Sequence, residues 1–430
     1  MAQIYSKKAW ITERILSSDM NRMENALSGR CATYVVDPTG ANGDYQTIQE
    51  AINAVGVSNR GRIFLKRGVY NINATLTVPQ NVEFFEMTGE NGAEIKDAGI
   101  VGGPLVKVGI ESVIGNGKYC KFDNLIFNGN GFNNQLLEVY RMFGGVYVGR
   151  CGFINSGTPP KAGIYIRSCT DVNIQGNYFE GHDYYAAEFN NVHRGLCYGN
   201  NVKDCLHGFR MEDCQKFAVV GNKFTDPSGT PIRYVMVAKN CGWIELLANT
   251  SIDFEIFCAL ETDFHDVNII GNTQYGGSDF VKDFSLGATA KNLVIKGNIS
   301  DVISDRAIQI TSGSSVQNVI IGENVFNEVQ NDGVLLENID GLVLDNNVIR
   351  NPGQSANNTY DGIKFIGCTY VTVNGNVITS LTANKMRKAI EEVIPGDYAN
   401  VTGNTCRGSQ TAPGITIVGG NSIKANNIDA

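Results

Sequence analysis

The sequence predicts an all-β fold, a right-handed single-stranded parallel β-helix in which short strands stack into a solenoid. Three observations predict this class: a strand-like phrase recurs along most of the chain, an asparagine recurs at one place in that phrase, and the composition suits many turns. The chain has 430 residues, with 49 Gly, 10 Pro and only 18% charged residues. Such a mixture favours many short strands joined by turns over long helices.

The repeated phrase alternates apolar residues and then reads Gly-Asn before another apolar residue. Clear copies begin at Val172 (VNIQGNYF), Val267 (VNIIGNTQ) and Val371 (VTVNGNVI). Eleven copies share an asparagine, and neighbouring asparagines are 22–29 residues apart. These residues, called the asparagine ladder below, are Asn177, Asn200, Asn222, Asn249, Asn272, Asn298, Asn324, Asn347, Asn376, Asn404 and Asn427. A unit of this length cannot bury a face alone, but stacked copies can, so the period predicts a solenoid.

A second strand-like segment precedes many of these copies, as in GIYIRSC from Gly163 and DGIKFIG from Asp361. Its alternating apolar residues have the period-2 pattern of a strand with one buried face. We therefore expect two strands and two turns in each coil. The ladder asparagine is expected at a tight turn inside the solenoid, because asparagine tolerates left-handed backbone and can hydrogen bond from coil to coil.

The cysteines fit the same pattern. There are eleven, an odd number without a Cys-x-x-Cys pair, which indicates free thiols in a reducing compartment. Cys169, Cys214 and Cys241 each stand eight residues before a ladder asparagine, at a position expected to face inward. We interpret them as small buried hydrophobic residues and not as catalytic or metal-binding groups.

Several classes of function are disfavoured by the composition. The net charge of −8 argues against a nucleic-acid partner. No stretch approaches the roughly 20 apolar residues of a membrane span, so we expect no membrane insertion. The first residues lack the apolar core of a signal peptide. The four histidines lack the spacing of metal ligands, and no metal site is expected.

The chain is expected to divide into three parts. Residues 1–30 differ in character, and Ser18–Asp19 can cap a short helix there with an apolar face. Residues 31–116 form an N-terminal cap and the first coils. Within them Thr47-x-x-Glu50 is a capping box, and the stripe that follows predicts a helix able to cover the open end of a solenoid. Residues 117–430 hold the β-helix repeats.

Two segments carry a resemblance to known families. Asp37–Val55 resembles the entry to pectate-lyase-like (pectin-lyase-like) β-helix proteins, which include polysaccharide lyases, glycoside hydrolases and bacteriophage tailspikes. Trp10–Leu27 resembles the N-terminal segment of phage and prophage tail and baseplate proteins. The resemblance implies a homotrimer that binds or cuts a surface glycan of a bacterial host. One departure is that many tailspikes end in a trimerisation domain, whereas here the repeat runs to the last residues.

The candidate site lies on the outward positions of the strand that opens each coil. Aligned on the ladder, three consecutive coils present there Tyr165 and Arg167, then Glu188 and Asn190, then Arg210 and Glu212. A solvated face with ion pairs is the ordinary interpretation of such a strand. The functional interpretation is a polysaccharide site, because aromatic and polar groups gather here. The segment Gly181–Tyr185 and His207 flank it.

The residue roles follow from this alignment. Glu188 and Glu212 should have α-carbons roughly 8 Å apart, which suits the acid and base of an inverting hydrolase. Asp183 is the reserve carboxylate. The remaining members are expected to bind substrate, and they are Tyr165, Arg167, Tyr184, Tyr185, Asn190, His207 and Arg210. Neighbouring arginines should lower the carboxylate pKa values, which does not suit a general acid and favours binding alone.

Three functions stay open. The leading hypothesis is a phage tail protein in the virion tail that recognises and depolymerises a bacterial surface polysaccharide, attached to other tail or baseplate proteins through residues 1–30. The second is a receptor-binding adhesin without turnover. The third is a free polysaccharide lyase or hydrolase. A lyase would use Arg167, Arg210 or Lys239 as base together with Ca²⁺, whereas the other functions need no cofactor.

Overall fold

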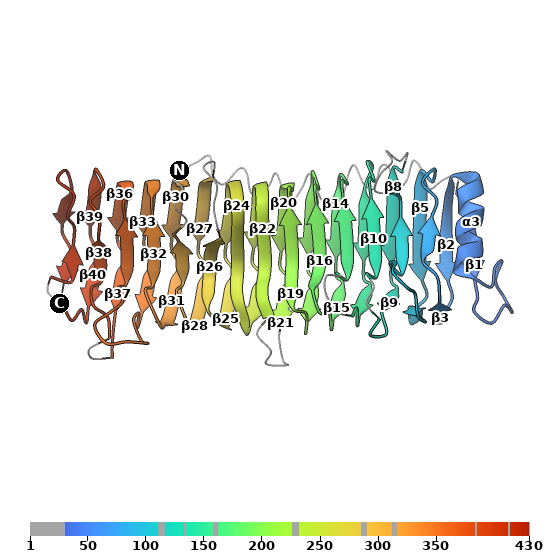
Figure 1. Cartoon of the computed structure of the whole chain (residues 1–430), viewed down its shortest axis with the longest axis horizontal. Helices are drawn as coiled ribbons and strands as arrows, with labels where there is room; N and C mark the ends of the chain where they lie inside the picture. Colours follow the sequence, from blue (N-terminus) through green and yellow to red (C-terminus); the bar gives the residue numbers. More distant parts are fainter. Residues whose placement is uncertain are drawn as a thin grey trace. The chain divides into compact units, whose positions relative to one another are not determined.

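The structure is a computed structural model that describes residues 31–110, 117–132, 135–157, 162–225, 232–284, 290–311, 316–382, 385–411 and 413–429. It divides into two compact units, one ending at Asn201 and the other beginning at Val202, and each is described by itself (Figure 1). Residues 1–30, with the predicted helix and the predicted attachment to tail proteins, lie outside the described residues.

Most coils hold three strands, one more than the sequence predicted. In the first unit, β13 (Ile164–Arg167), β14 (Val172–Gln175) and β15 (Tyr178–Glu180) form one coil. The repeated phrase contains both the second and the third strand, because the chain bends between them at Gly176, whose φ is +63°. Glycine adopts this left-handed conformation without the steric cost that a side chain adds. Equivalent strands pair in parallel from coil to coil, so each unit has a first, a second and a third row of strands.

The strands of the first unit are short and regularly repeated. Its first row contains β4 (Leu76–Val78), β7 (Val106–Val108), β10 (Leu137–Tyr140), β13 and β16 (Tyr185–Asn190). Its second row contains β1 (Ala32–Val36), β2 (Arg60–Leu65), β5 (Phe84–Gly89), β8 (Tyr119–Asp123), β11 (Val146–Gly149), β14 and β17 (Gly195–Tyr198). Its third row contains β3 (Gly68–Ile72), β6 (Ala93–Asp97), β9 (Ile126–Asn128), β12 (Gly152–Ile154) and β15, and β18 (Asn201–Lys203) begins at the last residue of this unit.

The second unit repeats the same three rows. Its first row contains β19 (His207–Glu212), β26 (Asp279–Phe284), β29 (Ile308–Ile310), β32 (Val334–Glu337), β35 (Ile363–Ile366), β38 (Ile390–Glu392) and β41 (Ile415–Thr416). Its second row contains β20 (Gln215–Val220), β27 (Lys291–Lys296), β30 (Val316–Gly322), β33 (Ile339–Asp345), β36 (Thr369–Asn374), β39 (Ala399–Thr402) and β42 (Ile423–Ala425). Two long strands, β22 (Ile232–Leu247) and β24 (Phe254–Ile270), pass through both rows.

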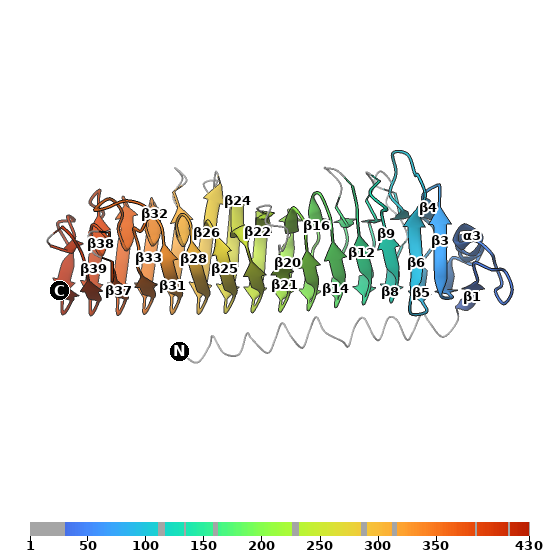
Figure 2. The same ribbon diagram turned by 90° about the horizontal axis from the view of Figure 1, so that it is seen from below.

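The third row of the second unit lies along the lower edge of the ribbon in Figure 1 and faces the viewer in Figure 2. There β25 (Thr273–Gly277), β28 (Ile299–Ile303) and β31 (Val325–Val329) lie side by side. The row contains β21 (Lys223–Thr225), β23 (Thr250–Ile252), β25, β28, β31, β34 (Val348–Arg350), β37 (Val377–Thr379), β40 (Thr405–Arg407) and β43 (Ile428–Asp429). The described strand pairings are parallel throughout, which confirms the parallel β-helix.

The predicted asparagine ladder forms inside each unit. In the second unit, hydrogen bonds link its members in sequence from Asn222 to Asn427. Asn324 is fully buried, and its Nδ2 donates to Ile295 O and to Asn347 Oδ1, both at 2.9 Å. In the first unit, Asn177 Nδ2 donates to Asn200 Oδ1 at 3.0 Å. The ladder thus satisfies the polar groups that each bend carries into the core.

Aromatic rings stack in the interior in the same manner. Phe127, Phe153 and Phe179 follow one another in the third row of the first unit, with ring centroids 4.8 and 5.2 Å apart. The predicted burial of Cys169, Cys214 and Cys241 is confirmed, and all eleven cysteines are free thiols. Burial raises the pKa of Cys169 to about 12, in keeping with an unreactive core residue.

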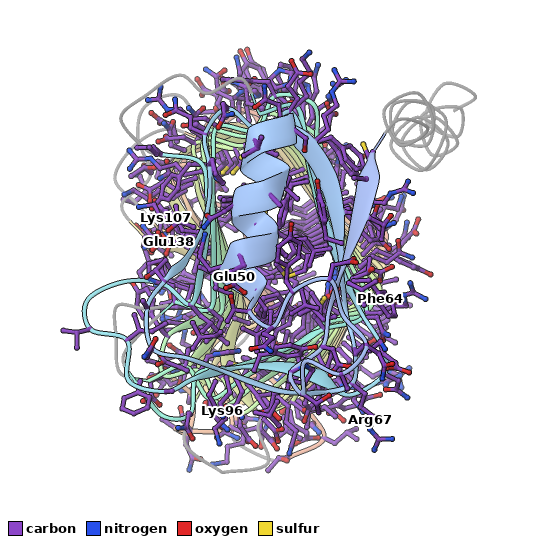
Figure 3. The ribbon with its side chains drawn as sticks, turned by 90° about the vertical axis from the view of Figure 1, so that its right-hand side faces the viewer. Glu50, Phe64, Arg67, Lys96, Lys107 and Glu138 are labelled. Carbon is purple, nitrogen blue, oxygen red and sulfur yellow. The ribbon has the colours of Figure 1, made fainter. Side chains whose placement is uncertain are left out.

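A helix covers the beginning of the first unit, as the sequence predicted. The helix α3 (Ile48–Ser58) starts at the Thr47 N-cap, and Thr47 and Glu50 form both hydrogen bonds of the capping box. The face made by Ile48, Ala51, Ile52 and Val55 is buried against β1, β2 and β4. Figure 3 shows the helix lying across the end of the unit, with Glu50 at its first turn. The helix therefore covers strand edges that would otherwise be exposed.

Candidate functional site

The outward face of the first row in the first unit carries the predicted residues of that unit. Strand register places Tyr165 beside Glu188 and Arg167 beside Asn190. All four side chains are partly exposed, whereas the alternate residues of these strands are buried. The parallel pleat therefore brings these four side chains onto one surface.

The same surface extends toward the N-terminus over residues that sequence reasoning missed. Register places Glu138 beside Tyr165 and Lys107 beside Glu138, while Tyr140 lies beside Arg167. Tyr140 donates a hydrogen bond to Glu138 Oε2 at 3.2 Å, and Lys107 Nζ lies 5.3 Å from the centre of the Tyr140 ring. The Tyr140 and Tyr165 rings meet edge to face at 5.9 Å. The alternation in VKV and LEVY, extended by one coil, was the signal that could have found them.

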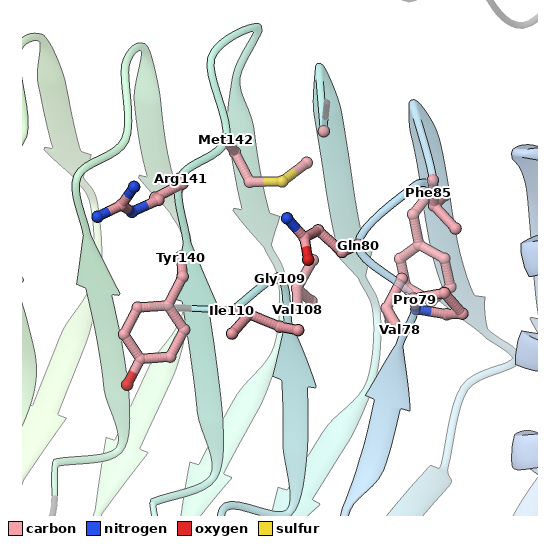
Figure 4. A pocket seen from close by; sticks show the side chains of 12 residues that line it. Val78, Pro79, Gln80, Phe85, Val108, Gly109, Ile110, Tyr140, Arg141 and Met142 are labelled. Atoms are coloured by element: carbon pink, nitrogen blue, oxygen red, sulfur yellow. The ribbon is translucent and has the colours of Figure 1, made fainter. Parts of the chain in front are cut away.

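We call the set Lys107, Glu138, Tyr140, Tyr165, Arg167, Glu188 and Asn190 the tyrosine face. A hollow adjoins it at the turns that follow the first-row strands, as Figure 4 shows. Tyr140 and Arg141 line one side of the hollow, and Pro79 and Gln80 line the other, with Ile110 between them. The tyrosine face thus combines aromatic rings, two cations and two carboxylates beside this hollow. Lys107, Tyr165, Arg167, Glu188 and Asn190 are partly exposed, whereas Glu138 and Tyr140 are each only 7% exposed.

The segment expected to wall the site is only partly at the surface. Asp183 is exposed and Tyr184 half-buried, whereas Tyr185 is only 5% exposed, with its ring centroid 4.5 Å from that of Tyr184. His182 faces the interior, where Nε2 donates to Phe153 O at 3.0 Å and Nδ1 accepts from Ser156. Burial lowers the pKa of His182 to about 4, so the ring stays neutral.

The remaining predicted residues belong to the second unit. Glu212 forms ion pairs with Arg210 at 3.0 Å and with Lys239 at 2.7 Å. The His207 ring stacks on Tyr234 at 5.1 Å. Arg210 and Lys239 therefore hold the Glu212 carboxylate in a network of ion pairs. Because Glu188 lies in the first unit, its pairing with Glu212 stays a prediction.

A second carboxyl pair, absent from the sequence prediction, lies in the first row of the second unit. Arg387 bonds Asp361 through Nε and Nη2 at 3.1 and 2.6 Å and also contacts Glu391, which Lys388 contacts at 2.7 Å. Burial raises the pKa of Asp361 to about 6, against the hydrogen bonds and charge of Arg387. For Glu391, burial acts upward, but the hydrogen bonds of Lys388 and Asp361 and the charge of Arg387 lower its pKa. The sequence feature that could have indicated Asp361 is the Asp-Gly pair at the start of DGIKFIG.

No group of three or more His, Cys, Asp or Glu side chains in the described ranges is arranged to hold a metal ion. No helix among the described residues is long and apolar enough to cross a membrane.

Comparison with known proteins agrees with the fold. The family model for the right-handed beta helix region matches residues 84–242, which confirms the predicted handedness. No curated protein matches the sequence significantly.

Several solved structures are similar at low identity. The A-module of an Azotobacter vinelandii mannuronan C-5 epimerase is 17% identical over 89% of this chain and 94% of its own, with a TM-score of 0.48. ORF18 of Geobacillus virus E2 is 15% identical over 70% of this chain and 62% of its own, with a TM-score of 0.44. The tailspike of E. coli bacteriophage HK620 is 13% identical over 88% of this chain and 66% of its own, also with a TM-score of 0.44.

Proposed function

We propose that this chain is a tailspike-like protein of a phage tail that binds a bacterial surface polysaccharide through the tyrosine face. The observation that carries the proposal is the alignment of the partly exposed Lys107, Tyr165 and Arg167 on one outward surface. Tyr140 is only 7% exposed and packs against the Tyr165 ring. Sugars are bound by aromatic rings together with polar groups, and cations at the same place add affinity for acidic sugars. Neighbouring strands within a row are about 4.8 Å apart, so successive coils can contact successive parts of a chain-like ligand.

The binding test uses purified capsular and wall glycans from candidate hosts, immobilised for biolayer interferometry. Tyr165→Ala and Arg167→Ala should each weaken binding about tenfold or more, which corresponds to one lost hot-spot contact. Tyr198→Ala is the matched control, because Tyr198 is 46% exposed on the second row of the same unit. Equal losses in Tyr165→Ala and Tyr198→Ala would refute a site on the tyrosine face.

The wider proposal is a homotrimer in the virion tail that attaches to tail or baseplate proteins through residues 1–30. Its support is the resemblance of Trp10–Leu27 to phage tail segments. Sedimentation of the full chain should give three times the monomer mass of 46.6 kDa. A chain that stays monomeric at micromolar concentration would exclude the trimer.

Depolymerisation is the second candidate function, favoured by the opposed pKa shifts of Asp361 and Glu391. Two carboxyls whose environments separate their pKa values are the usual arrangement of an acid and its partner. Asp361→Asn and Glu391→Gln should abolish release of reducing ends if this pair acts, while Glu188→Gln and Glu212→Gln should do so if the predicted pair acts. Melting temperatures of all four variants separate lost catalysis from lost folding. Absorbance of unsaturated uronate would instead indicate a lyase.

A further inference from the structure

A line of equivalent residues runs along an outer corner of the second unit, at the turn between the first-row and the second-row strands of each coil. Each member stands six positions before a ladder asparagine, and each has left-handed backbone, with φ between +50° and +80°. We call this set the corner row, and it includes Asp266, Asn292, Asn318, Gly341, Tyr370 and Tyr398. Glycine and asparagine are ordinary at such φ values, whereas tyrosine is not.

The polar members of the corner row hydrogen bond along the unit. Asn292 Nδ2 donates to Asp266 Oδ1 at 2.9 Å, and Asn318 Nδ2 donates to Asn292 Oδ1 at 3.0 Å. The next position is Gly341, which has no side chain to continue the series. A Cβ placed on Gly341 would lie 3.1 Å from Asn318 Oδ1, so this acceptor oxygen points toward the empty position.

Tyrosines stand on the other side of Gly341. Strand register places Gly341 beside Tyr370, and Tyr370 stacks on Tyr398 with ring centroids 5.5 Å apart and an interplanar angle of 5°. Tyr398 covers one face of the Tyr370 ring, and Gly341 is the neighbour of Tyr370 on the other side along the row. Tyr370 is 62% exposed, so burial does little to offset the backbone strain of a bulky residue in this conformation.

The missing side chain leaves a slot one ring thick. Asn318 and Tyr370 are two coils apart, which is roughly 9.6 Å at the spacing of paired strands. A ring placed at the level of Gly341 would lie about 4.8 Å along the row from Tyr370, similar to the 5.5 Å between the two tyrosines. The Cβ position at this level is 3.1 Å from Asn318 Oδ1, so this oxygen is within hydrogen-bond reach of the ring. The Asp340 carboxylate, which accepts a hydrogen bond from Thr369 at 2.7 Å, lies beside the slot and disfavours an anionic occupant.

We propose that this slot binds one neutral pyranose ring of a glycan, with the apolar face of the sugar stacked on Tyr370. A sugar hydroxyl donates to Asn318 Oδ1, and Gly341 forms the floor. The ring thereby takes the place in the corner row that the glycine leaves empty. The inference rests on the proposed polysaccharide binding and adds to it a second contact site, selective for uncharged sugar units.

The test follows the Tyr370 ring itself in full-length protein labelled with 3-fluorotyrosine. Tyr370→Phe assigns its ¹⁹F signal. The probes are the methyl β-glycosides of glucose, galactose and N-acetylglucosamine, each added to tens of millimolar. We expect a saturable shift of the Tyr370 signal with at least one probe, and no shift of the signal of Tyr275, which is 48% exposed on β25.

Gly341→Asn is the decisive variant. Asparagine is the residue that the corner row already holds at Asn292 and Asn318, with φ of +58° and +56°. Gly341, with φ of +80°, has left-handed backbone too, which asparagine tolerates, so the side chain of this variant should fill the slot. This change should weaken the binding of the methyl glycoside probe by about tenfold or more. Absence of any Tyr370 shift in the parent protein, or an equal shift in Gly341→Asn, would overturn the proposal.

Separate variants test the tyrosine face and the slot. Tyr165→Ala should leave the Tyr370 shift intact, and Gly341→Asn should leave acidic-glycan binding at the tyrosine face intact. A Tyr370 shift without any effect of Tyr165→Ala on whole glycans would support the slot and refute the tyrosine face.

Discussion

The asparagine ladder and the corner row of the second unit place similar residues at the same spacing in opposite environments. Asn324 and Asn318 are six positions apart in one coil, and both hydrogen bond to the asparagine of a neighbouring coil. Asn324 is fully buried and also donates to a backbone carbonyl, whereas Asn318 is exposed. Periodicity alone therefore does not reveal which row holds the fold together, because the energetic weight of a hydrogen bond depends on what replaces it when it is lost.

Loss of a ladder asparagine should have the largest effect. Asn324→Ala removes the acceptor of the Asn298 backbone N–H and the donor to Ile295 O, and leaves both groups buried without these bonds. Each of the two groups costs about 1–3 kcal/mol, so we expect the free energy of unfolding to fall by about 2–6 kcal/mol. Urea denaturation followed by circular dichroism measures it. A loss below that of a typical surface substitution would mean that the ladder does not stabilise the core.

Protonation of a buried group should affect stability strongly, as loss of a ladder asparagine does, and unlike a substitution in the corner row. The pKa of His182 is lowered from 6.5 to about 4 by burial, so the folded state holds fewer protons than the unfolded state. Its contribution to stability is complete above pH 6.5 and is lost as the pH falls toward 4, by about 3 kcal/mol in total. Urea midpoints at several pH values over this window measure the loss. His182→Gln, which can keep the bonds to Ser156 and Phe153, should flatten this dependence.

The exposed His193 supplies the control for this pH series. His193→Gln should leave the decline of stability between pH 6.5 and 4 unchanged. A decline that survives in His182→Gln would place the responsible group elsewhere.

Substitution in the corner row should have a small effect on stability. Asn318→Gly loses one exposed hydrogen bond but keeps the left-handed backbone, which glycine adopts without strain. The free energy of unfolding should change by about 0.5 kcal/mol or less. A loss as large as that of Asn324→Ala would remove the distinction between the two rows.

The repeat made most of the fold predictable from the sequence. The ladder positions, the inward cysteines and the capping helix at Thr47–Ser58 were all found by counting intervals and apolar stripes. The third strand was missed, because a bend at Gly176 divides a phrase that looks continuous in the sequence. The corner row was missed too, since its members share a backbone conformation but not a residue type.

The candidate site was less predictable than the fold. Outward positions on one strand can be read from alternation, which placed Tyr165, Arg167, Glu188 and Asn190 together on one surface. Contacts such as Tyr140 with Glu138, or Arg387 with Asp361, depend on register between coils of unequal length. Intervals of 22–29 residues vary too much for side-chain neighbours to be aligned by counting.

The smallest expected effect on stability is that of substituting a cysteine. Thiol reactivity nevertheless distinguishes buried from exposed positions. Ten of the eleven are buried and only Cys31 is partly exposed. Burial raises the pKa of Cys151 and Cys406 to about 12, so their thiolates are scarce and their sulfur atoms inaccessible. Native protein should therefore react quickly with Ellman's reagent at one thiol per chain, and at all eleven after unfolding. Cys31→Ser should abolish the fast phase and change the free energy of unfolding by about 0.5 kcal/mol or less. A fast phase of several thiols would show that coils open in the native state.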